Sequence, residues 1–247
     1  MVETAKHLRR VIRDTTFAAL LSPVLIWQAV GLRRRALKLP EAIGPRHGTS
    51  GTGMPLRLLI VGDSSAAGVG ASHQSEALAG QLALALSDRH HVQWTLIART
   101  GITTNGMLRA LDAYALPPSD IAVIVLGVND VTHGAPLRRW LKDHEALRGQ
   151  LRDRAGVRRT YVAQVPPLGA FPLLPAPLRT VLGRRADRFD AALRLMLDRT
   201  PDATYIALPE TLDPADMASD GFHPGPAIYA TWAKDLARRI LSDGPEG

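Results

Sequence analysis

The chain has 247 residues, of which 46% are hydrophobic and none is cysteine. This length and composition predict one α/β domain with an extension and argue against a disordered chain. Without cysteine, the chain cannot form disulfides, thiolate nucleophiles or cysteine-bound metal sites.

The net charge of +7 is concentrated near the N-terminus. Residues 1–40 contain eight basic and two acidic residues, whereas the other 207 contain 22 and 21. A nearly neutral body argues against nucleic acid as a partner. A basic excess beside an apolar segment favours contact between residues 1–40 and an anionic membrane surface, with a solvated arginine face as the alternative.

Residues 15–32 form an uncharged stretch of 18 residues. We interpret residues 1–40 as a basic and apolar N-terminal helix that either spans or lies on a membrane, or docks on the protein's own body. A cleaved signal peptide is less consistent with the sequence, because no small-x-small cleavage site follows. The length is short for a span, and Pro23 and Gln28 weaken that alternative. Localisation is therefore left open between membrane-associated and cytoplasmic.

Glycine and proline are frequent over the next residues, which predicts a linker over 41–53 and a catalytic domain over 54–247. In that domain apolar runs alternate with helical spacing. This alternation predicts a parallel sheet covered by helices on both faces, a three-layer α/β/α sandwich. The expected strands are 56–61, 92–98, 121–126, 160–165 and 204–208. The expected helices are 75–86, 104–113, 136–154, 178–199 and 227–241.

Polar residues and glycines follow several of these strands directly. Ser64 follows the first strand, Gly101 the second and Asn129 the third, and Asp220 and His223 come after the fifth. Functional crevices in parallel sheets lie beyond the carboxyl ends of the strands. We therefore expect these residues to lie at one edge of the sheet.

Ser64, His223 and Asp220 have the residue types of a nucleophilic site. A serine needs a base to take its proton, and the base needs a third group to orient it. We assign Ser64 as nucleophile, His223 as general base and acid, and Asp220 as the orienting carboxylate. Gly221 permits the turn that brings Asp220 and His223 together.

Acyl transfer also needs donors for the developing oxyanion. The backbone N–H groups of Ser64 and Gly101 and the side-chain amide of Asn129 are the candidates. Each assigned residue also has an ordinary structural explanation: a helix cap for Ser64, a turn for Gly101 or Asn129, and a solvated surface for His223.

Four other residues have secondary predicted roles. Asp63 and Asp130 are expected to brace their loops by accepting backbone hydrogen bonds. His133 is a candidate substrate contact, with a loop-bracing role as the alternative. Phe171 lies in the apolar, proline-rich stretch 168–177, which is expected to wall the acyl or alcohol pocket, to face the N-terminal segment, or simply to pack down.

These blocks, in this order, resemble the SGNH subgroup of the GDSL esterase/lipase family. GDS-x-x-x-G is matched at 62–68, the glycine block at Gly101, G-x-N-D at 127–130 and D-x-x-H at 220–223. The resemblance implies a flavodoxin-like five-stranded parallel sheet of order 2-1-3-4-5. It also implies an oxyanion hole from Ser64, Gly101 and Asn129, and a serine hydrolase without metal or cofactor. The chain lacks G-x-S-x-G, which disfavours the α/β-hydrolase fold.

The predicted function is hydrolysis of small-molecule or lipid-like carboxylic esters through an acyl-enzyme on Ser64. An acyltransferase with the same triad is an alternative that the sequence does not distinguish. A nucleotide- or phosphate-binding module would explain the glycines at 62–70. However, the chain lacks G-x-x-x-x-G-K-[ST] and G-x-G-x-x-G, and this alternative gives Asn129, Asp220 and His223 no role.

Overall fold

The computed structural model describes residues 21–35, 37–171, 173–209 and 214–244. Within them, one six-stranded sheet has the order β1-β3-β2-β4-β5-β6. Strands β2 to β6 are parallel, and in their own numbering they have the predicted order 2-1-3-4-5. The strands are β1 (His47–Ser50), β2 (Met54–Gly62), β3 (His90–Ala98), β4 (Ile121–Val125), β5 (Arg159–Ala163) and β6 (Ala203–Ile206).

The prediction of a five-stranded, wholly parallel sheet was wrong at one edge. Strand β1 lies in the stretch predicted as a linker and pairs antiparallel with β3, from His47 opposite Thr95 to Ser50 opposite Val92. Its sequence, HGTS, has no apolar alternation, because the strand is short, polar and only half covered. Gly48 allows this strand to approach the indole of Trp94 closely. The sheet is therefore mixed.

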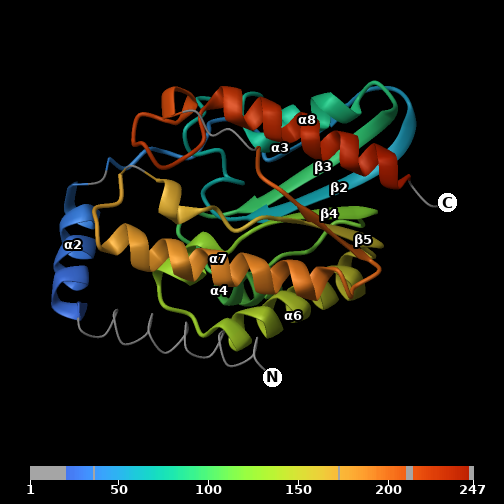
Figure 1. Cartoon of the computed structure of the whole chain (residues 1–247). Coiled ribbons are helices and arrows are strands. Elements are labelled where there is room, and N and C mark those ends of the chain that lie inside the picture. Colours follow the sequence, from blue (N-terminus) through green and yellow to red (C-terminus); the bar gives the residue numbers. More distant parts are fainter. Residues whose placement is uncertain (1–20, 36, 172, 210–213, 245–247) are drawn as a thin grey trace.

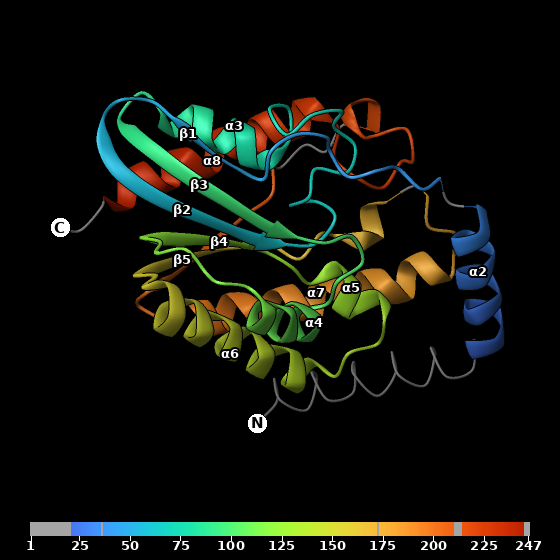
Figure 2. The ribbon, with the colours of Figure 1, turned by 180° about the vertical axis from the view of Figure 1, so that it is seen from behind.

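Helices cover both faces of the sheet, which gives the predicted three layers (Figures 1 and 2). Alternate residues of β2 enter opposite cores: Leu58 and Ile60 pack with the helices on one face, and Leu59 and Val61 with those on the other. The first face carries α3 (Leu78–Leu86) and α8 (Pro226–Asp243). The second carries α4 (Thr104–Ala110), α6 (Leu137–Ala155) and α7 (Leu178–Leu197).

Short helices that the hydrophobic pattern did not predict lie near the carboxyl ends of the strands. One turn of helix, α5 (Val128–Thr132), follows β4, and its N-cap is Gly127, which has a φ of 135°. Single 3-10 turns are too short to produce a periodic pattern. They are η2 (Leu168–Ala170) and η3 (Pro214–Asp216). The turn η1 (Leu111–Ala113) directly follows α4 and lies within the helix predicted over 104–113.

The N-terminal segment is described from residue 21, so residues 15–20 of the predicted apolar helix lie outside the described part. Helix α2 (Ser22–Arg35) lies at the start of α7, where the Gln28 amide donates to the Ala176 carbonyl at 2.7 Å and accepts the Leu178 N–H at 3.1 Å. This contact matches the alternative of docking on the protein's own body. The continuous apolar helix over 15–32 is not shown.

The membrane-spanning alternative is not supported. No helix among the described residues is long and apolar enough to cross a bilayer. The outward face of α2 nevertheless exposes Val24, Ile26, Trp27 and Val30, with Trp27 72% exposed. Association of residues 1–40 with a membrane surface stays a prediction.

Candidate active site

Ser64 lies two residues beyond the end of β2, at the carboxyl edge of the sheet. The Asp63 N–H still bonds to the Val125 carbonyl at 3.0 Å, so the chain leaves the sheet only at Ser64. Gly62 makes this turn possible, because a Cβ there would lie 2.5 Å from the Ala66 Cβ and 2.6 Å from the Val125 oxygen. The result is a serine that is 5% exposed and held in a fixed place.

His223 connects Ser64 to Asp220 in a continuous chain of hydrogen bonds. The Nε2 atom of His223 lies 2.9 Å from the Ser64 Oγ, across 159 residues of sequence. Its Nδ1 atom lies 2.6 Å from the Asp220 Oδ2. The structure thus brings together the three residues that the sequence singled out as nucleophile, base and orienting carboxylate.

Asp220 is 9% exposed, and its other oxygen binds the local backbone. The N–H groups of Phe222 and His223 donate to the Asp220 Oδ1 at 2.9 and 3.0 Å. Burial acts to raise the pKa of Asp220, but the hydrogen bonds from His223 and Phe222 outweigh it, so the pKa lies below its usual value. Asp220 is therefore ionised at neutral pH.

The charge of Asp220 sets the tautomer of His223. An ionised carboxylate only accepts hydrogen bonds, so the 2.6 Å contact requires a proton on Nδ1. In the neutral imidazole Nε2 is then an acceptor, and Ser64 Oγ–H is placed to donate to it. This arrangement can remove the hydroxyl proton as the oxygen attacks an electrophile.

Gly101 lies in the loop after β3, and Asn129 lies in α5, directly after β4; these two strands flank β2. Gly101 has a φ of 78°, and a Cβ built on it would meet no atom within 4 Å, so space beside its backbone is open. The Asn129 amide nitrogen donates to the Ile102 carbonyl at 3.0 Å and to the Asp63 carboxyl at 3.3 Å. Asn129 is thereby linked both to the loop of Gly101 and to the residue before Ser64.

The predicted bracing roles of Asp63 and Asp130 are confirmed. Asp63 accepts the Ser65 N–H at 3.1 Å, and Asp130 accepts both the N–H and the hydroxyl of Thr104. Burial, with a smaller contribution from the charge of Asp130, raises the pKa of Asp63 to about 7. Burial raises the pKa of Asp130 as well. These carboxyls hold three loops together beneath the site.

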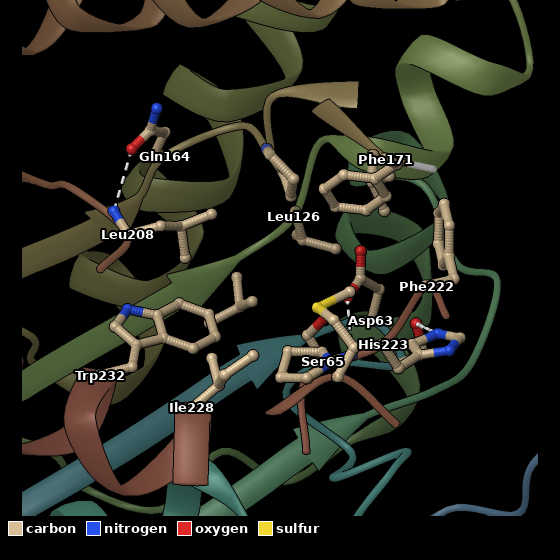
Figure 3. Close-up of a pocket in the computed structure, with 16 residues that line it drawn as sticks. Asp63, Ser65, Leu126, Gln164, Phe171, Leu208, Phe222, His223, Ile228 and Trp232 are labelled. Atoms are coloured by element: carbon tan, nitrogen blue, oxygen red, sulfur yellow. Dashed lines mark hydrogen bonds between the residues drawn. The ribbon is translucent and has the colours of Figure 1, made fainter. Parts of the chain in front are cut away.

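A mostly apolar pocket opens beside Ser64 and His223 (Figure 3). It lies between the carboxyl ends of β4, β5 and β6 and the first half of α8. The Phe171 and Phe222 rings meet edge to face at 5.2 Å, and Phe222 also contacts the His223 ring. The main apolar lining consists of Val125, Leu126, Val128, Pro166, Phe171, Leu208, Met217, Phe222, Ile228 and Trp232.

The two candidate substrate contacts have different outcomes. Phe171 lines the pocket, as predicted, whereas His133 is exposed at the end of α5 and does not line it. The loop that contains Phe171 also reaches α2 through Ala176, so two of its predicted roles occur together.

Sequence reasoning missed Leu208, Ile228 and Trp232 as pocket residues. Their apolar spacing is the same as that of core residues, and only their arrangement in space separates the two roles. The described residues also contain no cluster of His, Asp and Glu side chains suited to a metal ion.

Comparisons with known proteins agree with this geometry. Residues 60–231 match the GDSL-like Lipase/Acylhydrolase family. A GDSL-like esterase of Mycobacterium tuberculosis is 30% identical over 205 residues, which cover 76% of this chain and 62% of that protein. The chain thus spans less than two thirds of this relative.

Two solved structures share the fold. The psychrotrophic esterase EstA from Pseudoalteromonas has a TM-score of 0.58 and 22% identity, over 75% of this chain and 97% of that one. Est24, a carbohydrate acetylesterase from Sinorhizobium meliloti, has a TM-score of 0.60 and 17% identity, over 76% of this chain and the whole of that one. With the family match over most of the domain, we conclude that the chain belongs to the GDSL-like lipase/acylhydrolase family.

Proposed function

We propose that this protein is a serine hydrolase that cleaves carboxylic esters through an acyl-enzyme on Ser64. The observation that carries the proposal is the chain of hydrogen bonds from the Ser64 Oγ through the His223 imidazole to Asp220, at 2.9 and 2.6 Å. Membership in the GDSL-like family supports it, since esterases are found among the chain's relatives. Each residue then has one chemical task.

In the first half of the reaction the Ser64 Oγ attacks the ester carbonyl while the His223 Nε2 takes its proton. The carbonyl oxygen becomes an oxyanion, which the N–H groups of Ser64 and Gly101 and the Asn129 amide stabilise. When the intermediate collapses, the C–O bond to the alcohol breaks and the alcohol oxygen takes the proton from His223. The acyl group stays on Ser64, and the negative charge of Asp220 stabilises the transient imidazolium.

The second half repeats these steps with water. His223 removes a proton from water as the water oxygen attacks the acyl carbon, and the same donors stabilise the second oxyanion. Collapse breaks the bond to the Ser64 Oγ, which recovers its proton from His223. The products are the carboxylic acid and the free enzyme.

Asn129 can donate to the oxyanion because one of its present hydrogen bonds is weak. Its contact with Asp63 measures 3.3 Å, against 3.0 Å for the contact with the Ile102 carbonyl. With its pKa raised to about 7, Asp63 is partly protonated at neutral pH and accepts less strongly. One amide N–H can therefore turn to the oxyanion while the other still holds the loop.

The first test is turnover of p-nitrophenyl acetate by Ser64→Ala. We expect the variant to fold normally and to lose at least about 10³-fold in kcat, because the nucleophile is absent. Ser72→Ala, which removes an exposed serine of the same loop, is the matched control and should keep full activity. Full turnover by folded Ser64→Ala would refute the proposal.

The same acyl-enzyme could pass its acyl group to an alcohol. Adding glycerol or a sugar during turnover and measuring the ester formed separates the two reactions. Hydrolysis as the main reaction predicts that most of the acyl group appears as free acid. A dominant ester product would identify the protein as an acyltransferase that uses the same residues.

A further inference from the structure

The pocket beside Ser64 has a closed end. Figure 3 shows His223, which contacts Ser64, at one end of the pocket and Leu208, Ile228 and Trp232 on the opposite side. Trp232 is 2% exposed, so its indole forms part of the core as well as the pocket wall. Beyond this indole the interior is filled by the core on the α3 and α8 face of the sheet.

The pocket is small. Its cavity volume is about 50 Å³. One water needs roughly 10–15 Å³ of such volume, so there is room for about four groups of this size. A chain of about four carbon atoms fits, and a fatty-acid chain does not fit without displacing the wall.

On the basis of the proposed function, we propose that this pocket holds the acyl part of the substrate, and that Trp232 limits it to short chains of about four carbons. Because the pocket lining is mostly apolar, we expect the acyl chain that it holds to be apolar. The polar groups of the lining beyond the catalytic end are the amide of Gln164, whose carbonyl oxygen already accepts the Leu208 N–H at 2.9 Å, and the single indole N–H of Trp232. The substrate class is therefore short-chain acyl esters.

The order of events favours the acyl group over the alcohol as the occupant. The alcohol must leave before water attacks, whereas the acyl group stays on Ser64 through both half-reactions. A pocket that is closed behind by Trp232 suits the group that stays. The alcohol then lies toward solvent, and its structure has little effect on the rate.

A series of p-nitrophenyl esters from acetate to decanoate tests this directly. Each methylene buried should raise kcat/KM by about fourfold, which corresponds to about 0.8 kcal/mol, until the pocket is full. We expect a maximum near butanoate and a fall of at least tenfold by octanoate. A series with constant acyl and varied alcohol groups should vary by less than about threefold.

Two substitutions should move this limit in opposite directions. Trp232→Ala opens the closed end and should shift the maximum to octanoate or longer. Ile228→Phe adds bulk to the pocket and should shift it to acetate. Because Trp232→Ala removes a core side chain and can fail to fold, Ile228→Phe keeps the proposal testable on its own.

Leu236→Ala is the control for a loosened core. Leu236 lies one turn beyond Trp232 on α8, is buried, and does not line the pocket. Leu236→Ala should lower the stability of the protein without changing the acyl chain length at which kcat/KM is greatest. A maximum that stays at butanoate in folded Ile228→Phe, or a preference that follows the alcohol, would overturn the proposal. The proposed function fails separately, if no ester in either series is cleaved by way of Ser64.

Discussion

Asp220 and His223 are only three residues apart in the sequence, yet only one of them contacts the nucleophile Ser64. His223 contacts the nucleophile directly at 2.9 Å, whereas Asp220 acts only through the His223 ring. Loss of the base removes proton transfer altogether. Loss of the carboxylate leaves a base that is poorly oriented and has no fixed tautomer.

We therefore expect His223→Ala to lower kcat by about 10⁶-fold and Asp220→Ala by about 10⁴-fold, with p-nitrophenyl butanoate as substrate. Combining either change with Ser64→Ala should add little, because the three residues act as one unit. Equal losses for the two single variants would contradict the assignment of Asp220 as an orienting group.

Asp63 links the active site to the pH dependence of folding. Its pKa is about 7 in the folded protein, because of burial and the nearby charge of Asp130, and ordinary in the unfolded chain. Between about pH 4 and 7 the folded state keeps a proton that the unfolded state has lost. Asp63 therefore lowers the free energy of unfolding as the pH rises through this window.

Asp63→Asn should remove this effect while keeping an oxygen to accept the Ser65 N–H. We expect the free energy of unfolding of the variant, minus that of wild type, to rise with pH between 4 and 7, by up to about 1.4 kcal/mol per pH unit. Urea unfolding of both proteins at several pH values measures this difference. Asp120→Asn is the control. The Arg57 hydrogen bond lowers the pKa of Asp120, so the contribution of Asp120 to the free energy of unfolding is already constant above about pH 4. A constant difference for Asp63→Asn would contradict the raised pKa.

At the scale of elements, α2 docks on the body through the hydrogen bonds of Gln28 and the packing of Leu32 against the core. Gln28 makes two hydrogen bonds to the chain at Ala176 and Leu178, and the helix is otherwise largely uncovered. At about 1 kcal/mol each, these bonds contribute about 2 kcal/mol to docking, which corresponds to a factor of about 30 in the population of the detached helix.

Gln28→Ala should accordingly speed tryptic cleavage after Arg34 and Arg35 by about thirtyfold, with little change in the global midpoint of unfolding. Gln81→Ala, on α3 of the opposite layer, should leave this cleavage rate unchanged. An unchanged rate in Gln28→Ala would mean that other contacts hold α2. Co-sedimentation of the full chain with anionic vesicles tests the separate prediction of membrane-surface association.

The helices and buried strands were predictable because each has a hydrophobic period of its own. The segments predicted at 121–126 and 178–199 are observed as β4 and α7 within two residues at each end. Strand β1 was not predictable in this way, because its polar residues pair with β3 through backbone groups that any sequence provides. Helix α5 was missed because one turn is too short for a period.

At the scale of the whole molecule, the catalytic residues could be predicted from the sequence, whereas the pocket residues could not. Ser64, Asn129, Asp220 and His223 are polar residues that lie between the strands and helices of the sequence pattern or just after a strand, where a core explanation is weak. Trp232 and Leu208 are apolar residues in apolar patterns, so nothing in the sequence distinguishes a pocket wall from a filled core. The pocket forms where these apolar side chains of α8 and of the loops after β4, β5 and β6 face one another.

The chain of contacts from Ser64 to Asp220 joins the first strand of the parallel sheet to the loop before the last helix. The fold therefore has to be complete before Ser64 has a base. This dependence explains why the reactivity of Ser64 is a property of the whole molecule, and why it provides the most direct test of the account.

That test is stoichiometric labelling by a fluorophosphonate, followed by mass spectrometry of the proteolytic peptides. The account predicts one label per chain, on Ser64, with loss of esterase activity in proportion to labelling. It also predicts labelling slowed by at least about 10³-fold in His223→Ala, because the imidazole no longer takes the hydroxyl proton. Labelling of another residue, or undiminished esterase activity in the fully labelled protein, would contradict it.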